Sequence, residues 1–225
     1  MTNSTKTQTA RPEALANPAS SHMASGRSSA SIDGRVRRGE RSREAIVGAM
    51  LDLIREGVTR PSSNQIADRA GVTQRTLFNH FADVPTLMGE VVAAQVEFVR
   101  RNLPEPPESS LPILARAEQF FGEIAGLLDA IAPVRIAAYS FPVRMDAVDA
   151  GVENVRSLLR EAIAQTFAPE LARLSHAEFG EVLDELEVLA DPVSWRLRRV
   201  LQQHSSQAAA MHAAHSACKI AKLRS

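Results

Sequence analysis

The sequence contains a single cysteine, Cys218, which excludes an intramolecular disulfide and is consistent with a reducing compartment. It has no run of about 18 apolar residues, the length that a membrane-spanning helix needs. No apolar signal segment of secretory type is found near its start. Glycine-rich phosphate loops, His-Glu-x-x-His motifs and Gly-x-Ser-x-Gly elbows are missing as well. We therefore expect a cytoplasmic protein that is not membrane-bound, has no cofactor or metal, and is not an enzyme.

Strand alternation and hairpin turns are also missing from the sequence. Apolar residues instead recur at three- and four-residue spacing through most of the chain after residue 42. Hydrophobic residues make up 44% of the sequence, enough to build a substantial core. These patterns predict an all-α protein.

The net charge is zero, but it is unevenly distributed. Residues 35–82 hold nine arginines and five acidic residues, a net charge of +4. Residues 103–225 hold twelve basic and sixteen acidic residues, a net charge of −4. The first of these segments suits a polyanionic partner such as DNA, and the second does not.

Residues 62–81, SSNQIADRAGVTQRTLFNHF, have the pattern of two short helices joined by a tight turn. Ser62, with a glutamine three positions later, forms a capping-box pair. Gly71 follows where the first helix must end, because glycine adopts the left-handed conformation without penalty. Thr73 is the N-cap of the second helix, whose apolar residues four apart share one face. The pattern predicts a helix-turn-helix reader of DNA.

Residues 39–101 also resemble the N-terminal DNA-binding domain of TetR-type transcriptional regulators, over 63 of the 225 residues. The motifs that carry the resemblance are Ile66-Ala67, Ala70-Gly71-Val72, Thr73 and Thr76-Leu77-Phe78-Asn79-His80-Phe81. Three positions depart from the family pattern: Phe78 replaces the usual Tyr, Val84 a Lys, and Ser63 a small apolar residue. The expected fold is a three-helix DNA-binding domain followed by a helical ligand-binding and dimerisation domain.

Composition shifts give the expected domain boundaries. The first 34 residues are rich in Ser, Thr and Ala and have few large apolar residues, which predicts a disordered tail. Four prolines in residues 103–112 predict a linker or exposed loop. The expected parts are a tail (1–34), the DNA-binding domain (35–84), a connecting helix (85–102) and the effector-binding and dimerisation domain (103–225).

Individual helices are predicted from spacing and from helix-ending residues. The first runs from about Arg43 to Glu56 and is ended by Gly57. In the C-terminal half we expect helices over about 113–133, 134–145 with a break at Phe141-Pro142, 151–167 opened by Gly151, 179–189 and 205–223.

The polar side chains of the second helix of the pair are candidates for DNA contact. Gln and Asn pair with adenine edges, and Arg with guanine N7 and O6. The expected base-reading residues are Gln74, Arg75 and Asn79. The expected contacts to the DNA backbone are Arg35, Arg37, Arg38, Arg41, Ser62, Thr73, Thr76 and His80. The arginines at 35, 37 and 38 form either a flexible basic arm, which we favour, or a solvated linker.

The resemblance further implies a ligand pocket between the middle helices and a dimer seam formed by the last two. Candidate pocket residues are Phe120, Phe121, Ile124, Tyr139, Phe141, Met145, Leu159 and Phe167, and the alternative is that they are core residues. Arg135 and Arg144 lie among these residues in the sequence. Two interpretations stay open for them: they bind an acidic effector, or they are solvated surface residues.

His212, His215 and Cys218 lie three residues apart, which places a possible zinc or copper set on one broad helical face. A fourth ligand is not evident in the sequence. We expect these residues to fill the dimer interface and not to bind a metal.

The expected function is a bacterial, nucleoid-associated transcriptional repressor that binds a palindromic operator in double-stranded DNA as a homodimer. A small-molecule effector releases it. Two alternatives stay open: a helical ligand-binding or enzymatic protein whose helix-turn-helix corner is only structural, and an architectural DNA-binding protein without an effector.

Overall fold

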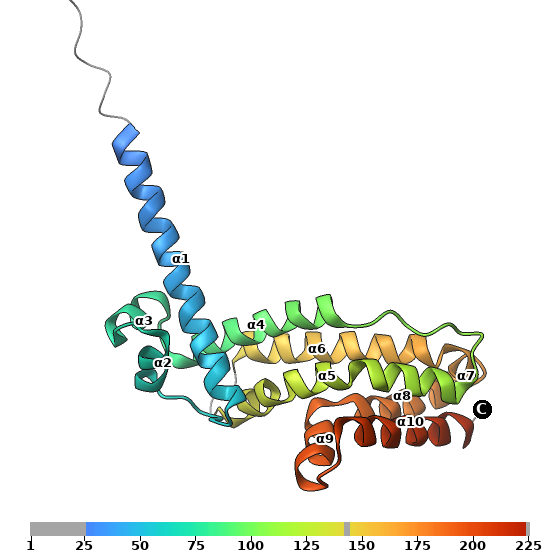
Figure 1. Cartoon of the computed structure of the whole chain (residues 1–225). Coiled ribbons are helices and arrows are strands. Elements are labelled where there is room, and N and C mark those ends of the chain that lie inside the picture. The colour runs from blue at the N-terminus through green and yellow to red at the C-terminus, as the bar shows by residue number, and fades with distance from the viewer. Residues whose placement is uncertain (1–25, 142–144, 224–225) are drawn as a thin grey trace, which may run out of the picture. The chain divides into compact units, whose positions relative to one another are not determined.

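The computed structural model describes residues 26–141 and 145–223, and within these ranges the elements are helices without any strand (Figure 1). The all-α prediction is therefore confirmed. The elements are α1 (Gly26–Arg55), α2 (Ser63–Ala70), α3 (Gln74–His80), α4 (Val84–Asn102), α5 (Ile113–Ser140), α6 (Asp146–Thr166), α7 (Ala168–Leu171), α8 (His176–Ala190), α9 (Pro192–Arg196), the π-helical turn η1 (Leu197–Leu201) and α10 (Ser206–Leu223). None of the described helices is both long and apolar enough to cross a membrane.

The first helix differs from the prediction, because α1 begins at Gly26 and not near Arg43. Residues 26–34, assigned above to a disordered tail, are helical, and the arginines expected in a flexible arm also lie on α1. The chain has no proline between residues 18 and 61, so nothing in the sequence stops the helix from extending toward the N-terminus. Residues 1–25 lie outside the described residues, and residues 26–40 belong to a unit separate from residues 41–225.

The larger unit has two hydrophobic cores. The first gathers α2, α3 and the C-terminal part of α1 against α4, with Ile46, Leu77 and Leu87 fully buried. The second gathers α5, α6, α8 and α10, with Phe120 and Trp195 buried. Both α4 and α5 contribute residues to each core, so these two helices join the cores physically.

Two predicted helix breaks are wrong. Helix α5 continues through Pro133, because burial on both sides of this proline outweighs the one backbone hydrogen bond that it removes. Gly151 does not open a helix but lies inside α6, which begins at Asp146. The break after Ser140 is confirmed. On α4, Phe98 is exposed, whereas Val96 is buried.

The sequence analysis missed α9 and η1, which together form a short hook between α8 and α10. Asp191 caps the hook and accepts hydrogen bonds from the backbone N–H groups of Val193 and Ser194 (2.9 and 3.0 Å). The Asp129 carboxylate on α5 then holds it, accepting from Trp195 Nε1 (2.8 Å), Arg199 Nε (2.8 Å) and Ser206 Oγ (2.9 Å). One acidic residue therefore fixes α9, η1 and the start of α10 to α5.

Replacing this carboxylate tests its structural role. Burial opposes ionisation of Asp129, but hydrogen bonds from Arg199, Trp195 and Ser206 outweigh it and hold its pKa below the ordinary value of 3.8. We expect Asp129→Asn to lower the free energy of unfolding by about 1–3 kcal/mol, because charged hydrogen bonds are lost. Since a lowered pKa stabilises the fold only while the carboxylate is ionised, the difference from wild type should shrink as pH falls below 3.8 in urea titrations. A pH-independent difference would contradict this role.

Candidate nucleic-acid interface

The corner between α2 and α3 is built by its capping residues, as predicted. Ser62 Oγ accepts from the backbone N–H of Gln65 (3.3 Å), and the Ser62 N–H donates to Gln65 Oε1 (2.9 Å). Gly71 ends α2 in the left-handed conformation, with φ of 65°. Thr73 Oγ1 accepts from the backbone N–H of Thr76 (3.1 Å) and so starts α3. These local bonds fix the angle between the two helices before any tertiary contact is considered.

The inner side of the corner is apolar and closed. Ile66 and Ala67 of α2 are buried, as are Leu77 of α3 and Phe81 just beyond it. Asp83 then caps α4 by accepting from the N–H of Thr86 (2.7 Å). Hydrogen bonding from the Thr86 side chain, and then from its N–H, lowers the pKa of the Asp83 carboxyl. Helix α3 is thus anchored along one face, and its other face lies at the surface.

That outer face carries the predicted base-reading residues, and all three are exposed. Arg75 and Asn79 lie one helical turn apart and, among the described residues, make no hydrogen bond or ion pair. Gln74 differs, since its Nε2 donates to Ser63 Oγ (3.2 Å) and to Asn64 Oδ1 in α2. The alternative in which Arg75 pairs with a surface acid therefore has no support in the described part of the chain.

The residues predicted to contact the DNA backbone lie in different settings. Ser62, Thr73 and Thr76 take part in the helix caps, and His80 is half-buried at the end of α3. Arg41 is exposed within the larger unit. The arginines at 37 and 38 are exposed on the part of α1 that forms the separate N-terminal unit, while the side chain of the arginine at 35 lies outside the described residues.

The sequence analysis missed Arg43, which contacts the end of α3 and holds it in place. Arg43 Nη2 lies 2.7 Å from Glu90 Oε1 on α4, and Arg43 Nη1 donates to the His80 carbonyl (3.4 Å). The same guanidinium stacks over the Phe81 ring at 4.5 Å. One side chain of α1 thus contacts the end of α3 and the flank of α4. Its partners are 37 or more residues away in the chain, so sequence spacing gave no signal for it.

A second arginine of the domain is also neutralised internally. Arg69 of α2 donates two hydrogen bonds to Glu56 at the end of α1 (2.8 and 2.7 Å). This hydrogen bonding lowers the pKa of the Glu56 carboxyl. Arg43 and Arg69 therefore contribute less to the positive field of this domain than a simple count of charges implies. Arg75 is the exposed arginine of α3.

The structure does not bring the eight predicted pocket residues together. Phe120, Phe121, Ile124, Leu159 and Phe167 are buried in the second core, and Phe141 and Met145 pack against the first. Tyr139 is 62% exposed. A groove of about 570 Å³ between α5 and α10 is lined by none of the eight. Most of the eight thus lie within the two cores, and their role in a ligand pocket stays a prediction.

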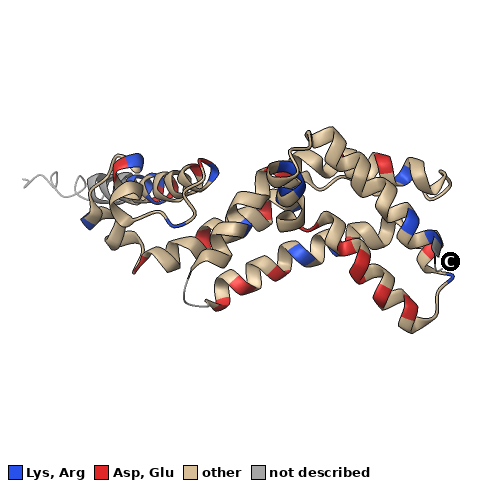
Figure 2. Ribbon diagram, turned by 90° about the horizontal axis from the view of Figure 1, so that it is seen from below, with Lys and Arg blue, Asp and Glu red and all other residues tan. Residues whose placement is uncertain are grey.

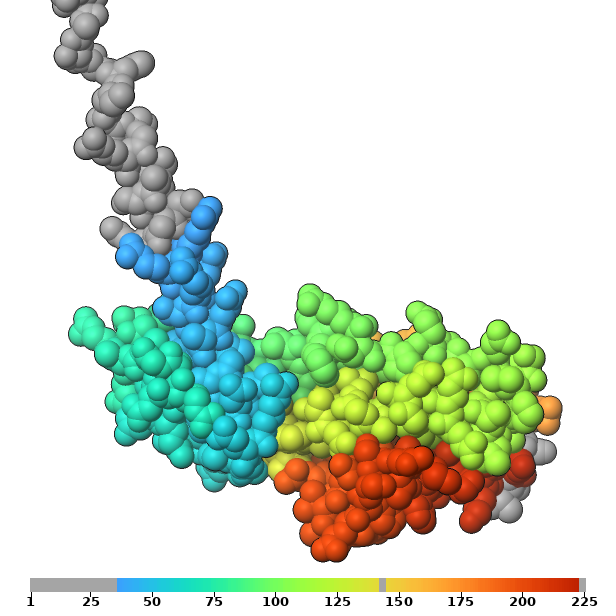
Figure 3. All heavy atoms as spheres, in the orientation of Figure 1, coloured from blue at the N-terminus to red at the C-terminus, as the bar shows by residue number. Residues whose placement is uncertain are grey.

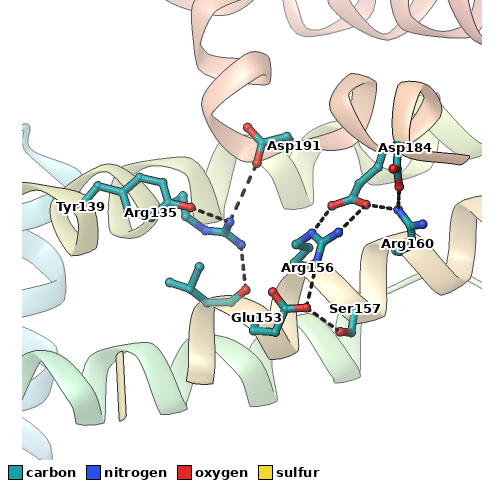
Figure 4. A network of polar contacts seen from close by, with 10 residues as sticks. Arg135, Tyr139, Glu153, Arg156, Ser157, Arg160, Asp184 and Asp191 are labelled. Carbon is teal, nitrogen blue, oxygen red and sulfur yellow. Dashed lines mark hydrogen bonds and ion pairs between the residues drawn. The ribbon is translucent and has the colours of Figure 1, made fainter. Parts of the chain in front are cut away.

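Arg135 is buried, at 3% exposure, so its interpretation as a solvated surface residue is wrong. Its Nη2 donates to the Val152 carbonyl of α6 (3.2 Å), and its Nη1 donates to the Tyr139 hydroxyl (3.4 Å) (Figure 4). Asp191 Oδ2 lies 3.9 Å away. Arg135 thus ties α5 to α6 and to the corner between α8 and α9, while Arg144 lies outside the described residues.

The possible metal set is split by the structure. Cys218 is buried in the second core, where burial raises the pKa of its thiol. His212 and His215 are exposed, the first stacking on His204 (centroids 4.6 Å apart) and the second lying 3.8 Å from Glu118. Within the described residues no three His, Cys, Asp or Glu side chains are grouped as metal ligands would be.

Replacing Arg43 tests its role in positioning α3. The half-exposed ion pair is worth about 0.2–1 kcal/mol and the contact with the Phe81 ring about 0.5–1 kcal/mol. We therefore expect Arg43→Ala to lower the free energy of unfolding by about 1–2 kcal/mol and to weaken DNA binding. The matched control is Arg55→Ala, because Arg55 makes only a 3.9 Å exposed pair with Asp52 on its own helix. Equal losses of stability for the two variants in urea titrations would contradict this role.

Comparison with known proteins agrees with this geometry. No protein-family model matches the chain, and no curated protein matches it. Among solved structures, the chain is similar to a TetR-family transcriptional regulator from Streptomyces coelicolor, with a TM-score of 0.63, 17% identity and 80% of each chain covered. It is also similar to a transcriptional regulator from Rhodococcus sp. Rha1, with a TM-score of 0.60, 14% identity, and 81% of this chain and 97% of that chain covered. The chain therefore has the all-helical fold of these regulators, which confirms at the level of the fold the resemblance found in residues 39–101.

Proposed function

We propose that this protein is a transcriptional repressor that binds a palindromic operator as a homodimer and is released by a small-molecule effector. The observation that carries the proposal is α3, a short helix anchored along one face and exposing Arg75 and Asn79 on the other. Neither side chain has a partner within the described residues, so each is available to a base edge in the major groove.

The three base-reading candidates differ in how much they must give up on binding. Arg75 needs to break no contact seen among the described residues to reach guanine N7 and O6. Gln74 must release Ser63 and Asn64, or use its oxygen instead of its amide nitrogen. We therefore assign the larger share of sequence discrimination to Arg75 and Asn79.

A single short helix reads only a few base pairs, which favours a dimer. Two copies related by a two-fold axis and spaced by about one DNA turn (~34–36 Å) double the contacts and require an inverted repeat.

The proposed effector is an apolar or amphipathic molecule that prefers the conformation unable to bind DNA, by about 1–3 kcal/mol. We propose that α4 transmits effector binding to the DNA-binding domain and call it the lever. The first half of α4 packs in the core it shares with α2 and α3, and its second half packs in the other core. Its contact with α6 is close: a Cβ added to Gly151 would stand 2.3 Å from Val92 Cγ1.

Titrations on two kinds of DNA test the proposed base contact. Arg75→Ala should weaken binding to the cognate operator by about 1–3 kcal/mol and to random DNA much less, because a base contact carries sequence information. Arg37→Ala, the comparison variant on α1, should weaken both DNAs alike and reduce the slope of log affinity against log salt by about one per subunit. Equal losses on operator and random DNA for Arg75→Ala would show that it is not a base reader.

The lever is tested by crowding the contact between α4 and α6. Gly151→Ala should destabilise the protein by about 1–3 kcal/mol through overpacking and should lower DNA affinity, since α4 must shift. Adding Val92→Ala should restore both quantities in a double-mutant cycle. Gly180→Ala on α8 is the control, because an added Cβ there meets no atom within 4 Å. Lost stability with unchanged DNA affinity would contradict the role of α4.

A further inference from the structure

The first residue of α3 makes a side-chain contact with α2 that leaves only part of its amide free. Gln74 Nε2 donates to Ser63 Oγ (3.2 Å) and to Asn64 Oδ1. A glutamine amide has two N–H donors on its nitrogen and two acceptor sites on its oxygen. Both donors of Gln74 are therefore used within the protein. Its Oε1 accepts no hydrogen bond among the described residues, and the side chain is exposed.

This contact fixes which end of the amide a DNA duplex would meet. The nitrogen and the oxygen lie on different sides of the amide carbon, so a nitrogen that faces α2 turns the oxygen away from α2. In helix-turn-helix proteins the N-terminal residues of the second helix contact base edges in the major groove, and Gln74 is the first residue of α3. Figure 3 shows the teal surfaces of α2 and α3 adjoining each other, so a duplex that contacts α3 meets Gln74 together with its partners on α2.

A carbonyl oxygen without a free N–H beside it recognises one kind of base edge. In the major groove, adenine N6 and cytosine N4 are amino donors, whereas guanine O6 and thymine O4 are acceptors that repel the oxygen. The two-bond contact of glutamine with adenine also needs an N–H for N7, and both N–H groups of Gln74 are occupied. Freeing the amide would break two hydrogen bonds to gain one, so the fixed orientation is favoured.

We propose that Ser63 and Asn64 are positioning residues that make Gln74 an acceptor-only reader of the amino group shared by adenine and cytosine. An unrestrained glutamine would instead select adenine over cytosine. Holding the side chain before DNA arrives also reduces the entropy lost on binding. The inference rests on the proposed operator binding and names the specificity of one position in each half-site.

The contact is formed by uncharged side chains, which separates its effect from that of salt. Asp68, Arg69 and Arg75 are the only Asp, Glu, Lys or Arg residues of α2 and α3, and Figure 2 accordingly shows most of both ribbons in tan. Salt weakens the attraction between basic residues and phosphates for every DNA sequence alike. The ratio of affinities for two bases at this position should therefore stay constant while both affinities fall with salt.

Base substitutions in a selected operator test the proposal with the full-length wild-type chain. The position in question is the one at which Gln74→Ala removes discrimination between bases. Adenine and cytosine should there bind within about twofold of each other, and guanine and thymine about three- to tenfold more weakly, the value of one neutral hydrogen bond. Replacing adenine by 7-deazaadenine, which lacks N7, should leave affinity unchanged. Unsubstituted purine, which lacks the N6 amino group, should bind as weakly as guanine.

Variants of α2 test whether Ser63 and Asn64 cause this preference. Ser63→Ala combined with Asn64→Ala frees the amide, so adenine should gain about three- to tenfold over cytosine through a bond to N7, and 7-deazaadenine should lose that gain. Asn64→Asp keeps an oxygen that accepts from Gln74, so it should retain the wild-type ratio although its charge weakens binding to all DNA. Asp68→Ala is the matched control, because Asp68 is exposed one turn further along α2 and the ratio should not change. Circular dichroism should show wild-type helicity for each variant.

Several results would overturn the proposal. They are a wild-type preference for adenine over cytosine that 7-deazaadenine abolishes, a ratio that the double variant leaves unchanged, or a Gln74→Ala variant that alters discrimination at no position. A wild-type preference for guanine or thymine that Asn64→Asp converts to adenine and cytosine would show that the amide faces the opposite way. Failure of the wild-type chain to select any common sequence would contradict the proposed function itself.

Discussion

The close packing of α4 against α5 and α6 is the constraint on which the rest of this protein depends. Helix α4 buries Leu87 and Met88 beneath the helix-turn-helix corner and Val96 and Val99 in the second core. Gly151 lets α6 approach α4 so closely that even a methyl group would collide with Val92. Because the core is densely packed, a displacement of one helix is transmitted to the helices that pack against it. Any event that moves α6 must therefore displace α4 or open a cavity.

Buried polar groups set the geometry around this packing. Arg135 joins α5 to α6, and Gln95 of α4 donates to the Ile131 carbonyl of α5 (3.1 Å). Arg116 is almost fully buried and forms a close ion pair with Glu170 on α7. Such groups add little net stability, but removing one partner leaves an uncompensated polar atom in the core. They favour one arrangement of the helices over alternatives with similar apolar burial.

The local parts of the fold could be predicted from the sequence because local chemistry determines them. Ser62, Gly71 and Thr73 each act within three or four residues, and all three caps form as expected. Tertiary context decided the rest. Pro133 stays inside a helix because both cores bury its surroundings, and Phe98 is exposed although its spacing matches the buried face.

For the candidate site, helical periodicity was enough to predict which residues of α3 lie on its exposed face. It could not predict which side chains hold α3 in place. The contacts of Arg43 with Glu90 and of Asp129 with the hook join residues far apart in sequence, and no spacing rule reports them. The pocket expected from aromatic and Met residues stays a prediction. Aromatic content alone does not distinguish a core from a cavity, and most of these side chains fill the core.

The central claim is that α3 reads a specific sequence from both halves of a two-fold DNA site. Selection of bound duplexes from a random-sequence pool by the wild-type protein at physiological salt tests it most directly. The account predicts enrichment of an inverted repeat whose half-sites lie about one DNA turn (~34–36 Å) apart. Recovery of DNA with no common sequence, or of a single half-site without its repeat, would contradict it.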